Sequence, residues 1–549
     1  LCQTQNSVSG LCWVEEFEEF YGFTAEDIGR RVAEDDGQAS GESDLSFGEE
    51  TSDEEELESG DEGESDEWSR ELHEVELAPF DREVGPTNIL PAEANATDFL
   101  EQPFPPDLID LIVEETNRNA RRKDADRTYW EPVNASDIKI YLAIRLQQGI
   151  KSVPSERDYW ATSPFLGVKS IKDVMSKNKY VKINQYLHFN DAEKAKTRGQ
   201  EEHDKLFHVR PLIKRLSETF LKAYKPNREN AIDEGLIKYK GRLGFKQYMP
   251  LKPAKRGIKV WLWADSHTHY VSVFQVYAGR PKQNTAETGL GARVVTDLSR
   301  DLVGGHYHLF MDNFFSSFDL LKKLKNDGIY ATATTRTNRK EFPAEVKSAK
   351  LTNCGDAYVM QRQGIHATAW KDKKKRFFFL KQWKPARRPR KCYRKGKDCT
   401  SEKVSAPPCV VTYNKHMGGV DYADQKRGDY KIPIKSRRWY RYLFIFLFET
   451  AVVNSHILRN LSPNHKKITQ LDYRLELIEG LIGRNSSRKR KRASTEIEVV
   501  DGKSHFPVKV PINRCVHCAA VSERKRSTWG CALCNVTLCV GCFEPFHLK

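Results

Sequence analysis

Three pairs of cysteines near the C-terminus constrain the fold of this chain more than any other sequence feature. The two members of each pair are separated by two residues, and His547 follows the last pair; the pairs are Cys515 and Cys518, Cys531 and Cys534, and Cys539 and Cys542. Thiolates at this spacing reach one tetrahedral Zn²⁺ at about 2.3 Å, and the spacing differs from that of a secreted disulfide framework. We therefore predict a cysteine-rich zinc domain over residues 513–549, in which metal replaces the hydrophobic core that so short a segment lacks.

The sequence leaves the arrangement of the zinc ligands open. Two complete sites need eight ligands, whereas the cysteines and His547 supply seven. Either His517 or His505 is the eighth ligand, or the second site is incomplete. The pairs bind metal in either a sequential or a cross-braced order. In the complete case we expect two structural Zn²⁺ ions.

Charge is distributed unevenly along the chain. Residues 34–67 hold 17 Asp or Glu and no Lys or Arg, and removing them from the net charge of +13 leaves +30 on the remainder. A basic bulk predicts a polyanionic partner, because Lys and Arg that neutralise phosphates release counterions; a well-solvated surface is the alternative. The acidic, Ser- and Gly-rich residues 1–93 are predicted to be a disordered tail, since they cannot bury enough apolar surface to offset the ordering entropy.

No stretch of the sequence approaches the roughly 18–20 apolar residues that span a bilayer, so we expect no membrane partner. The most apolar run, residues 442–453, carries Glu449 and is predicted to be a buried helix. Residues 484–512 are predicted to be a linker. Its basic run RKRKR at 488–492 indicates either nuclear localisation or contact with phosphate.

The spacing of apolar residues changes near residue 230. Helical spacing predicts helices at 105–118, 133–150, 208–224 and 439–458. Short β-branched and aromatic segments predict strands at 229–241, 258–266, 269–279, 306–315 and 328–335. Helices are expected at 291–302, between the third and fourth of these strands, and at 317–326, between the fourth and fifth. This order predicts an α/β domain beside a helical one.

Residues 338–408 interrupt that order with a strongly basic run. Lys371 to Lys397 contain 14 Lys or Arg against one acid, Asp372, and aromatic residues interleave with them. The mixture favours a nucleic-acid groove, although a charged loop with its own small core has a similar composition. The candidate DNA-contacting residues are Lys373, Lys374, Lys375, Arg376, Arg387 and Arg388.

Four aspartates lie where a metal-dependent reaction on phosphate would need them. Asp233 falls in the first predicted strand, Asp312 ends a later one, and Asp421 and Asp424 follow a Gly pair that leads into a helix. The spacing of Asp421 and Asp424 places both on one helix face. Such carboxylates suit two Mg²⁺ ions, which take oxygen ligands and sit about 3.5–4 Å apart. Since an Asp at a strand end is often a turn or cap residue, the pattern alone leaves both interpretations open.

Three sequence blocks resemble the catalytic blocks of the piggyBac transposase family. They are NAIDEGLIKYKGRLGFKQYMPLKPAKRGIKVW at 230–261, YHLFMDNFFSS at 307–317 and YNKHMGGVDYADQ at 413–425, and the resemblance runs from about residue 97 to the C-terminus. It implies an RNase H-like α/β catalytic core, residues 230–337 and 409–430, which binds Mg²⁺ or Mn²⁺. Asp233, Asp312 and Asp421 match the catalytic aspartates of a DDE/D-type enzyme, and Asp424 matches a further required one.

The resemblance also implies roles for the other segments. Residues 338–408 match an insertion domain, and residues 97–229 with 431–483 match an all-α dimerisation and DNA-binding domain. Trp439 matches a Trp near the hairpinned transposon end, where it would stack on an extruded base; a core position at the start of an apolar helix is the alternative. The cysteine-rich domain would bind terminal repeats through Arg524, Lys525 and Arg526.

The implied reaction is cut-and-paste DNA transposition. Water frees a 3′-hydroxyl at the transposon end, this hydroxyl attacks the opposite strand to form a hairpin, and the reopened ends join TTAA targets. The pairing of two ends implies a homodimer on double-stranded DNA in the nucleus. The alternatives are a domesticated descendant that binds DNA or chromatin without cutting, a zinc module that binds chromatin peptides, and a plain zinc-containing scaffold.

Overall fold

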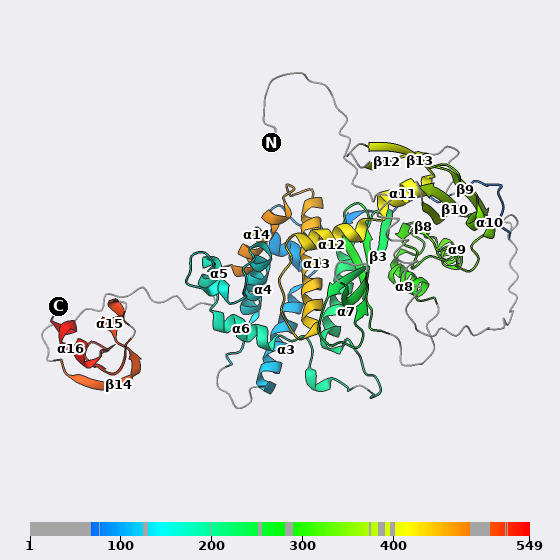
Figure 1. The fold of residues 1–549 in the computed structure, drawn as a ribbon. Helices are drawn as coiled ribbons and strands as arrows, with labels where there is room; N and C mark the ends of the chain where they lie inside the picture. Colours follow the sequence, from blue (N-terminus) through cyan, green and yellow to red (C-terminus); the bar gives the residue numbers. More distant parts are fainter. Residues whose placement is uncertain are drawn as a thin grey trace, which may run out of the picture. The chain divides into compact units, whose positions relative to one another are not determined.

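The computed structural model describes residues 67–75, 77–123, 130–197, 199–250, 255–279, 289–372, 375–382, 390–395, 401–483, 505–521, 523 and 525–548. The chain forms two compact units, Leu1–Ser487 and Arg488–Lys549, each with its own core. Figure 1 shows the elements of both units.

The helical part of the larger unit is built from chain segments that precede the sheet in the sequence and segments that follow it. The four helices predicted there are confirmed as α3 (Pro106–Lys123), α4 (Ala135–Ile150), α7 (Arg210–Ala223) and α13 (Trp439–Leu461). Shorter helices complete it: α2 (Ala96–Glu101), α5 (Lys169–Val174), α6 (Lys177–Tyr186) and α14 (Gln470–Ile482). Helix α13 is buried along almost its whole length and packs on α2, α7 and α14 (Figure 1). A helix this apolar is stable because neighbours cover every side of it.

A mixed nine-stranded sheet forms the centre of the larger unit. Its strand order is β4-β5-β3-β7-β8-β11-β10-β9, with β6 also paired to β5. Strand β3 is antiparallel to β5 and parallel to β7, which is parallel to β8. The strands are β3 (Glu229–Lys238), β4 (Gln247–Tyr248), β5 (Arg256–Asp265), β6 (Val271–Val276), β7 (His308–Met311), β8 (Tyr330–Thr334), β9 (Ala357–Arg362), β10 (Ile365–Asp372) and β11 (Lys375–Gln382). The predicted α/β core is confirmed.

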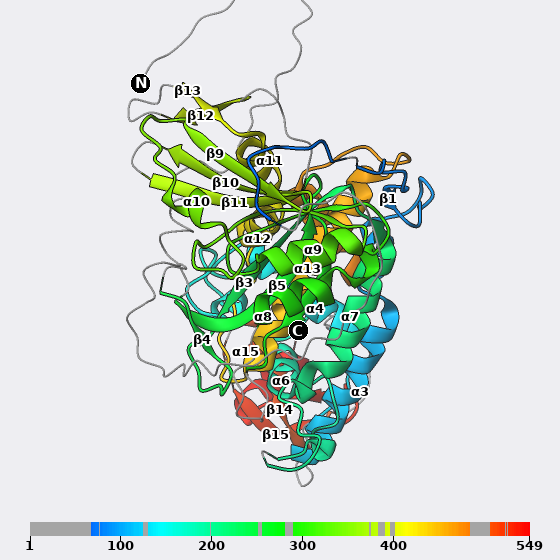
Figure 2. The same cartoon turned by 90° about the vertical axis from the view of Figure 1, so that its right-hand side faces the viewer.

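Helices cover both faces of this sheet. Helices α8 (Leu290–Leu298) and α9 (Phe318–Asn326) pack on the face that carries Trp261 and Trp263 (Figure 2). The opposite face carries Ala231 and Leu262 and is covered by α7, α12 (Gly419–Asp429) and α13. The alternation of side chains along each strand therefore decides which helices a residue of the sheet faces.

The basic segment 338–408 extends the main sheet. After α10 (Ala344–Ser348), strands β9 to β11 join the sheet through pairing of β11 with β8. The aromatic residues Trp370, Phe377 and Phe379 are buried against α11 (Pro408–His416), and are not displayed for stacking on bases. Among the described residues of this segment, β12 (Arg390–Lys395) and β13 (Ser401–Ala406) form a two-stranded sheet separate from the main one. The alternative of a charged segment with a small core thus fits the aromatic residues better than a groove lined by them.

The prediction of disorder through residue 93 is wrong for the described part that begins at residue 67. Trp68 packs edge-on against Phe318 with ring centroids 5.4 Å apart, and Phe80 packs in the same way on Tyr307 at 5.1 Å. Ser69 pairs with Gln361 at the edge of the sheet. Further along, β1 (Gly85–Pro86) pairs with β2 (Tyr224–Lys225). The aromatic anchors offset the ordering entropy that the acidic composition alone could not.

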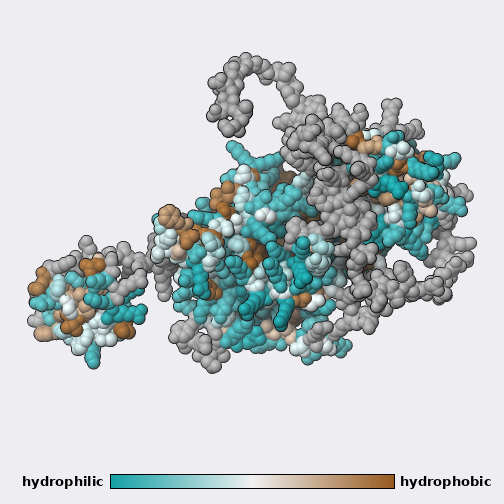
Figure 3. All heavy atoms as spheres, in the orientation of Figure 1, coloured by the Kyte–Doolittle hydropathy of each residue, from teal (hydrophilic) through white to brown (hydrophobic). Residues whose placement is uncertain are grey.

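The smaller unit is a three-stranded sheet with two short helices. The strands are β14 (Pro507–Arg514), β15 (Arg526–Cys531) and β16 (Val536–Thr537), and the helices are α15 (Val516–Ala520) and α16 (Val540–His547). Cysteines with Val536 and Leu538 make up its buried cluster, so apolar burial is small. Figure 3 shows scattered hydrophobic spots on both units rather than one broad patch. Among the described residues, no helix has the length and apolar character that crossing a membrane requires.

Candidate active site and metal centres

The pairing of two parallel strands brings Asp233 and Asp312 together. Ile232 of β3 is aligned with Met311 of β7, so the next residues along the two strands are Asp233 and Asp312. Both aspartates are buried, with exposures of 2% and 9%. Ligand oxygens of Asp233, Asp312 and Glu234 all lie within 4.8 Å of one another. These three carboxylates form the group that we call the carboxylate group.

Glu234 and Lys259 are members of this site that the sequence patterns did not single out. Lys259 Nζ lies 3.9 Å from Glu234 Oε2, and the side chains of both residues are almost fully buried. The same ammonium lies 4.4 Å from the ring centroid of Phe314, which follows Asp312 closely in sequence. A cation–π contact and a carboxylate together fix Lys259 next to the carboxylate group. The sequence signal was the pair Asp233–Glu234, but neighbours in a strand ordinarily face opposite sides.

Helix α12 carries Asp421 and Asp424 across the face of β3 that bears Asp233. A Cβ at Gly419 would lie 3.2 Å from the Ala231 Cβ, so glycine lets the helix start close to the strand. Further along β3, a Cβ at Gly235 would lie 3.7 Å from Asp424 Oδ2. Because residues 231, 233 and 235 point to one face, α12 runs over Asp233. Asp421 and Asp424 are half-buried on this helix and do not belong to the carboxylate group, and Asp424 forms an ion pair with Arg427.

The donor set of the carboxylate group suits a hard divalent cation. Three carboxylates this close together repel one another, and Lys259 places a positive charge beside them. Oxygen-only ligands favour Mg²⁺ or Mn²⁺ over softer metals. Asp233, Glu234 and Asp312 are therefore the residues that would hold such an ion, with the α12 carboxylates above the same strand.

The six cysteines form two clusters in a cross-braced order. Cys515 and Cys518 group with Cys539 and Cys542, whereas Cys531 and Cys534 group with His505 and His547. In the first cluster, Cys518 Sγ lies 3.4 Å from Cys542 Sγ and 3.7 Å from Cys539 Sγ. Tetrahedral Zn²⁺ with bonds of about 2.3 Å places its sulfurs about 3.8 Å apart, so the cluster fits zinc.

The second cluster brings in His505, one of the two eighth ligands that the sequence left open. His505 Nδ1 lies 3.4 Å from Cys531 Sγ and 3.5 Å from Cys534 Sγ. His547 Nε2 lies 3.6 Å from Cys534 Sγ, and its Nδ1 donates to the Phe543 carbonyl at 2.7 Å. That hydrogen bond leaves Nε2 free to bind metal, which is the usual outer support of a histidine ligand. His517 is in neither cluster.

The predicted DNA-contacting residues are spread over several elements. Trp439 is half-buried at the start of α13 and packs edge-on against Phe245 at 5.3 Å. Arg376 is exposed on β11 and donates to the Ala349 carbonyl at 3.2 Å. Lys525 pairs with Glu523 at 3.1 Å, and Arg526 is exposed on β15. Lys373, Lys374, Arg387, Arg388 and Arg524 lie outside the described residues, and of Lys375 only the backbone, in β11, is described.

The mixed sheet brings Asp233 of β3 beside Asp312, which follows β7, so the chain is an α/β protein with a candidate metal-dependent site. A family model described as Transposase IS4 matches residues 95–456, which is more than half of the chain. The chain belongs to this family, and its relatives are of the piggyBac type, which confirms the resemblance seen in the sequence.

Two human proteins and one solved structure illustrate the relationship. PiggyBac transposable element-derived protein 3 of Homo sapiens is 27% identical over 84% of this chain and 78% of its own length. PiggyBac transposable element-derived protein 2 of Homo sapiens is 27% identical over 70% of this chain and 64% of its own length. A cryo-EM structure of a piggyBac transposase synaptic complex with hairpin DNA matches with a TM-score of 0.66 at 22% identity, covering 84% of this chain and 100% of that one. The last match shows that the fold is shared.

Proposed function

We propose that this chain is a piggyBac-type DNA transposase that cuts and rejoins double-stranded DNA with a divalent cation. The observation that carries the proposal is the carboxylate group formed by Asp233 and Glu234 in β3 and Asp312 directly after β7, with Asp421 and Asp424 on α12 over the same strand. A chain of this family with four aspartates in these places has the ligands for phosphoryl transfer.

The chemistry consists of successive in-line displacements at phosphorus. Bound Mg²⁺ or Mn²⁺ would lower the pKa of the attacking water or hydroxyl and stabilise the leaving oxygen. Asp233, Glu234 and Asp312 would hold the cation, and Asp421 and Asp424 would add ligands from α12. Lys259 keeps the carboxylate group compact before metal binds. One site of this kind serves strand nicking, hairpin formation and joining to TTAA targets, since each step attacks a phosphodiester.

The remaining assignments follow from the same proposal. The zinc module binds the terminal repeats through exposed basic residues such as Lys525 and Arg526, as well as Arg524. Trp439 contacts the hairpinned end with the part of its ring that Phe245 leaves uncovered. The protein acts as a homodimer because two ends must be paired, and it works in the nucleus.

The decisive experiment compares the wild type with Asp312→Ala on a donor flanked by the element's own terminal repeats. We expect nicked and hairpinned ends with Mg²⁺ from the wild type and at least a 100-fold loss in the variant, because a metal ligand is removed. Asp319→Ala, an exposed residue of α9, is the matched control and should cut normally. Equal cutting by Asp312→Ala would refute the proposed active site.

The second candidate is a domesticated protein that binds DNA or chromatin without cutting it. The observation in its favour is that the human relatives carry the name transposable element-derived proteins. The same experiment distinguishes the active transposase from the domesticated protein. A wild type that binds the ends but leaves both strands intact with Mg²⁺ and Mn²⁺ supports this candidate.

A further inference from the structure

Residues 430–438 join the end of α12 to the start of α13, and we call this segment the connector. Its two ends carry functional residues of the proposed transposase, Asp421 and Asp424 on α12 and Trp439 at the first position of α13. It has no helix or strand of its own, so its path depends on the side chains that hold it.

We propose that Arg145 and Glu449 are positioning residues that fix the connector and so hold the α12 carboxylates at a set place relative to Trp439. This inference rests on the proposed function, because it assigns the two residues a role in the DNA reaction. Neither residue belongs to the carboxylate group or to the predicted DNA-contacting set.

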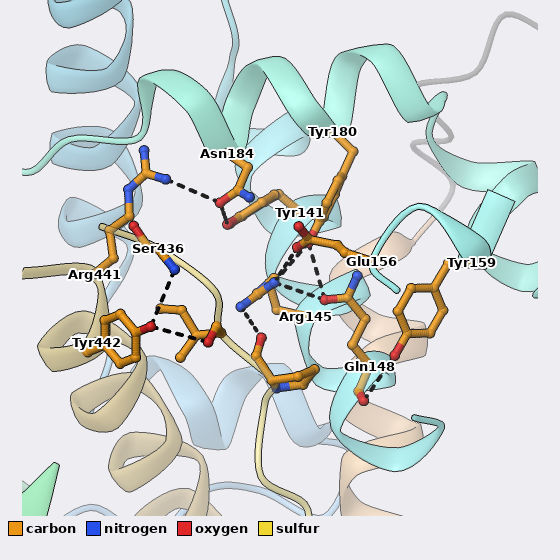
Figure 4. Close-up of polar contacts among 12 residues, drawn as sticks. Tyr141, Arg145, Gln148, Glu156, Tyr159, Tyr180, Asn184, Ser436, Arg441 and Tyr442 are labelled. Atoms are coloured by element: carbon orange, nitrogen blue, oxygen red, sulfur yellow. Dashed lines mark hydrogen bonds and ion pairs between the residues drawn. The ribbon is translucent and has the colours of Figure 1, made fainter. Parts of the chain in front are cut away.

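Arg145 of α4 is only 3% exposed, and its guanidinium forms a hydrogen bond to the connector. Its Nη2 donates to the Pro433 carbonyl at 2.6 Å. Its Nη1 donates to Tyr180, Glu156 and Gln148 at 2.9, 2.8 and 3.0 Å. Figure 4 shows this guanidinium between α4, α6 and the connector. Because its planar fork bonds on two sides at once, a smaller or apolar side chain cannot replace it.

Glu449 holds the connector from a different helix. It lies on α13, is 4% exposed, and accepts a hydrogen bond from the Ile432 backbone N–H at 2.6 Å. Adjacent residues of the connector, Ile432 and Pro433, are therefore held by buried side chains from two different helices. Removing either side chain leaves a buried backbone group without its partner.

Close packing supports the same path. A Cβ at Gly149 would lie 2.3 Å from the Tyr430 carbonyl oxygen, so α4 approaches the start of the connector at a distance that only glycine permits. The Tyr239 hydroxyl donates to the Arg437 carbonyl at 2.7 Å. The connector is thus held near its start, middle and end. A shift of either end must break at least one of these contacts.

This arrangement predicts an effect on the balance of two reaction steps, which distinguishes positioning from folding. A smaller folded fraction lowers nicking and hairpin formation equally. A displaced connector changes the place of Trp439 relative to the α12 carboxylates, and so affects the hairpin step, which needs both ends of the connector, more than the nick. Displacement of about 1 Å costs up to 100-fold in rate.

The test uses the full chain and measures nicked and hairpinned products with Mg²⁺, normalised to the amount of protein that binds the transposon ends. Arg145→Met and Glu449→Ala should lower the ratio of hairpin to nick 10- to 100-fold. Glu449→Gln keeps an oxygen acceptor for Ile432 and should restore the ratio. Lys139→Met, which removes an exposed ion pair of α4 with Glu101, is the matched control. Hydrogen exchange of amides 430–438 is measured in parallel and should speed up only in the two disruptive variants.

Each result of this test decides whether Arg145 and Glu449 are positioning residues. If both products fall in proportion, or if exchange in the connector is unchanged, the positioning role is overturned while the proposed transposase stands. If the wild type cuts neither strand, the proposed function fails, and with it the role in the reaction. If Arg145→Met does not fold, the comparison of Glu449→Ala with Glu449→Gln gives the answer.

Discussion

Lys259 places a positive charge beside the carboxylate group, which matters most when metal is absent. Its ammonium lies 3.9 Å from Glu234, and three carboxylates lie within 4.8 Å of one another. Lys259→Met keeps an aliphatic side chain against Phe314 but removes the positive charge beside Glu234. Since breaking a buried pair typically costs 3–5 kcal/mol and this site is not fully dry, we expect the free energy of unfolding in EDTA to fall by roughly 1–3 kcal/mol.

Denaturant unfolding in EDTA and in Mg²⁺ checks this prediction. Mg²⁺ should recover most of the loss, because the cation takes over the charge that the lysine supplied. The exposed Lys322 of α9 provides the control substitution, Lys322→Met. The same loss in EDTA and in Mg²⁺ would show that Lys259 acts through packing alone.

The side chain of His505 alone decides whether the second zinc site is complete. We expect two Zn²⁺ per chain in the wild type and weaker retention of one of them in His505→Ala, since the cluster with Cys531, Cys534 and His547 then has three ligands. Loss of a ligand or its support typically costs 10- to 100-fold or more in affinity. Native mass spectrometry after mild chelation measures the stoichiometry. His517→Ala should keep both ions, and a loss there instead would reverse the assignment.

The sequence predicted which residues form these sites better than it predicted how those residues are arranged in space. Asp233 and Asp312 were found because each stands in or at the end of an apolar strand, but only the register of β3 with β7 makes them neighbours. Glu234 was missed because adjacent strand residues normally face apart, whereas here its carboxylate oxygen lies within 4.8 Å of those of Asp233 and Asp312. His505 stayed one of several options because the motif spacing ends at Cys515.

At the scale of elements, the segment at residues 67–86 is held to the sheet by a few aromatic anchors. Trp68 packs on Phe318, and its indole N–H donates to the Glu341 carbonyl at 3.1 Å. Trp68→Ala removes both contacts, and because the ring is half-buried we expect a loss of roughly 1–3 kcal/mol, less than for a fully buried tryptophan. Limited proteolysis should then cut within 67–86 well before the sheet unfolds.

Trp68→Phe provides the comparison, since it keeps an aromatic ring and loses only the indole donor. We expect it to lie between the wild type and Trp68→Ala in its rate of proteolysis. A Trp68→Ala protein cut at the wild-type rate would mean that Phe80 and β1 hold the segment without help from Trp68.

Element prediction succeeded where periodicity was strong and failed where charge dominated the composition. The long apolar helix α13, the strand β3 and the strands β5 to β8 were expected close to their true positions. The strands β9 to β11 were not, because the run of Lys and Arg that begins at Lys371 masks the alternation that buries Trp370, Phe377 and Phe379. The start of the ordered chain was placed too late for the same reason, since acidic neighbours hid Trp68 and Phe80.

At the scale of the whole molecule, buried histidines make the larger unit sensitive to acid. Burial lowers the pKa of His188 to about 3, and that of His366 to about 4, and nearby cations add to the effect. Burial also lowers the pKa of His416 to about 4. Burial of Glu449 raises its pKa to about 7, which works in the opposite direction.

The sign follows from proton uptake. Below pH 6.5 the unfolded chain protonates these histidines while the folded chain does not, so stability is lost as the pH falls toward 4. At pH 5 each histidine accounts for roughly 1–2 kcal/mol, and the three together outweigh the gain from the single Glu449. We therefore expect the free energy of unfolding to fall by several kcal/mol between pH 7 and pH 5, as measured by denaturant titration at both values.

A histidine substitution separates this cause from general acid effects. His366→Gln removes one depressed group, and its stability should fall less steeply between pH 7 and pH 5 than that of the wild type, by roughly 1–2 kcal/mol. His73→Gln, at an exposed position, should keep the wild-type slope. Acid would place a positive charge on histidines that are buried in the core between the sheet and the helices. We therefore expect acid to weaken the larger unit cooperatively. A larger unit that is equally stable at pH 5 and pH 7 would rule out neutral buried histidines as part of its core.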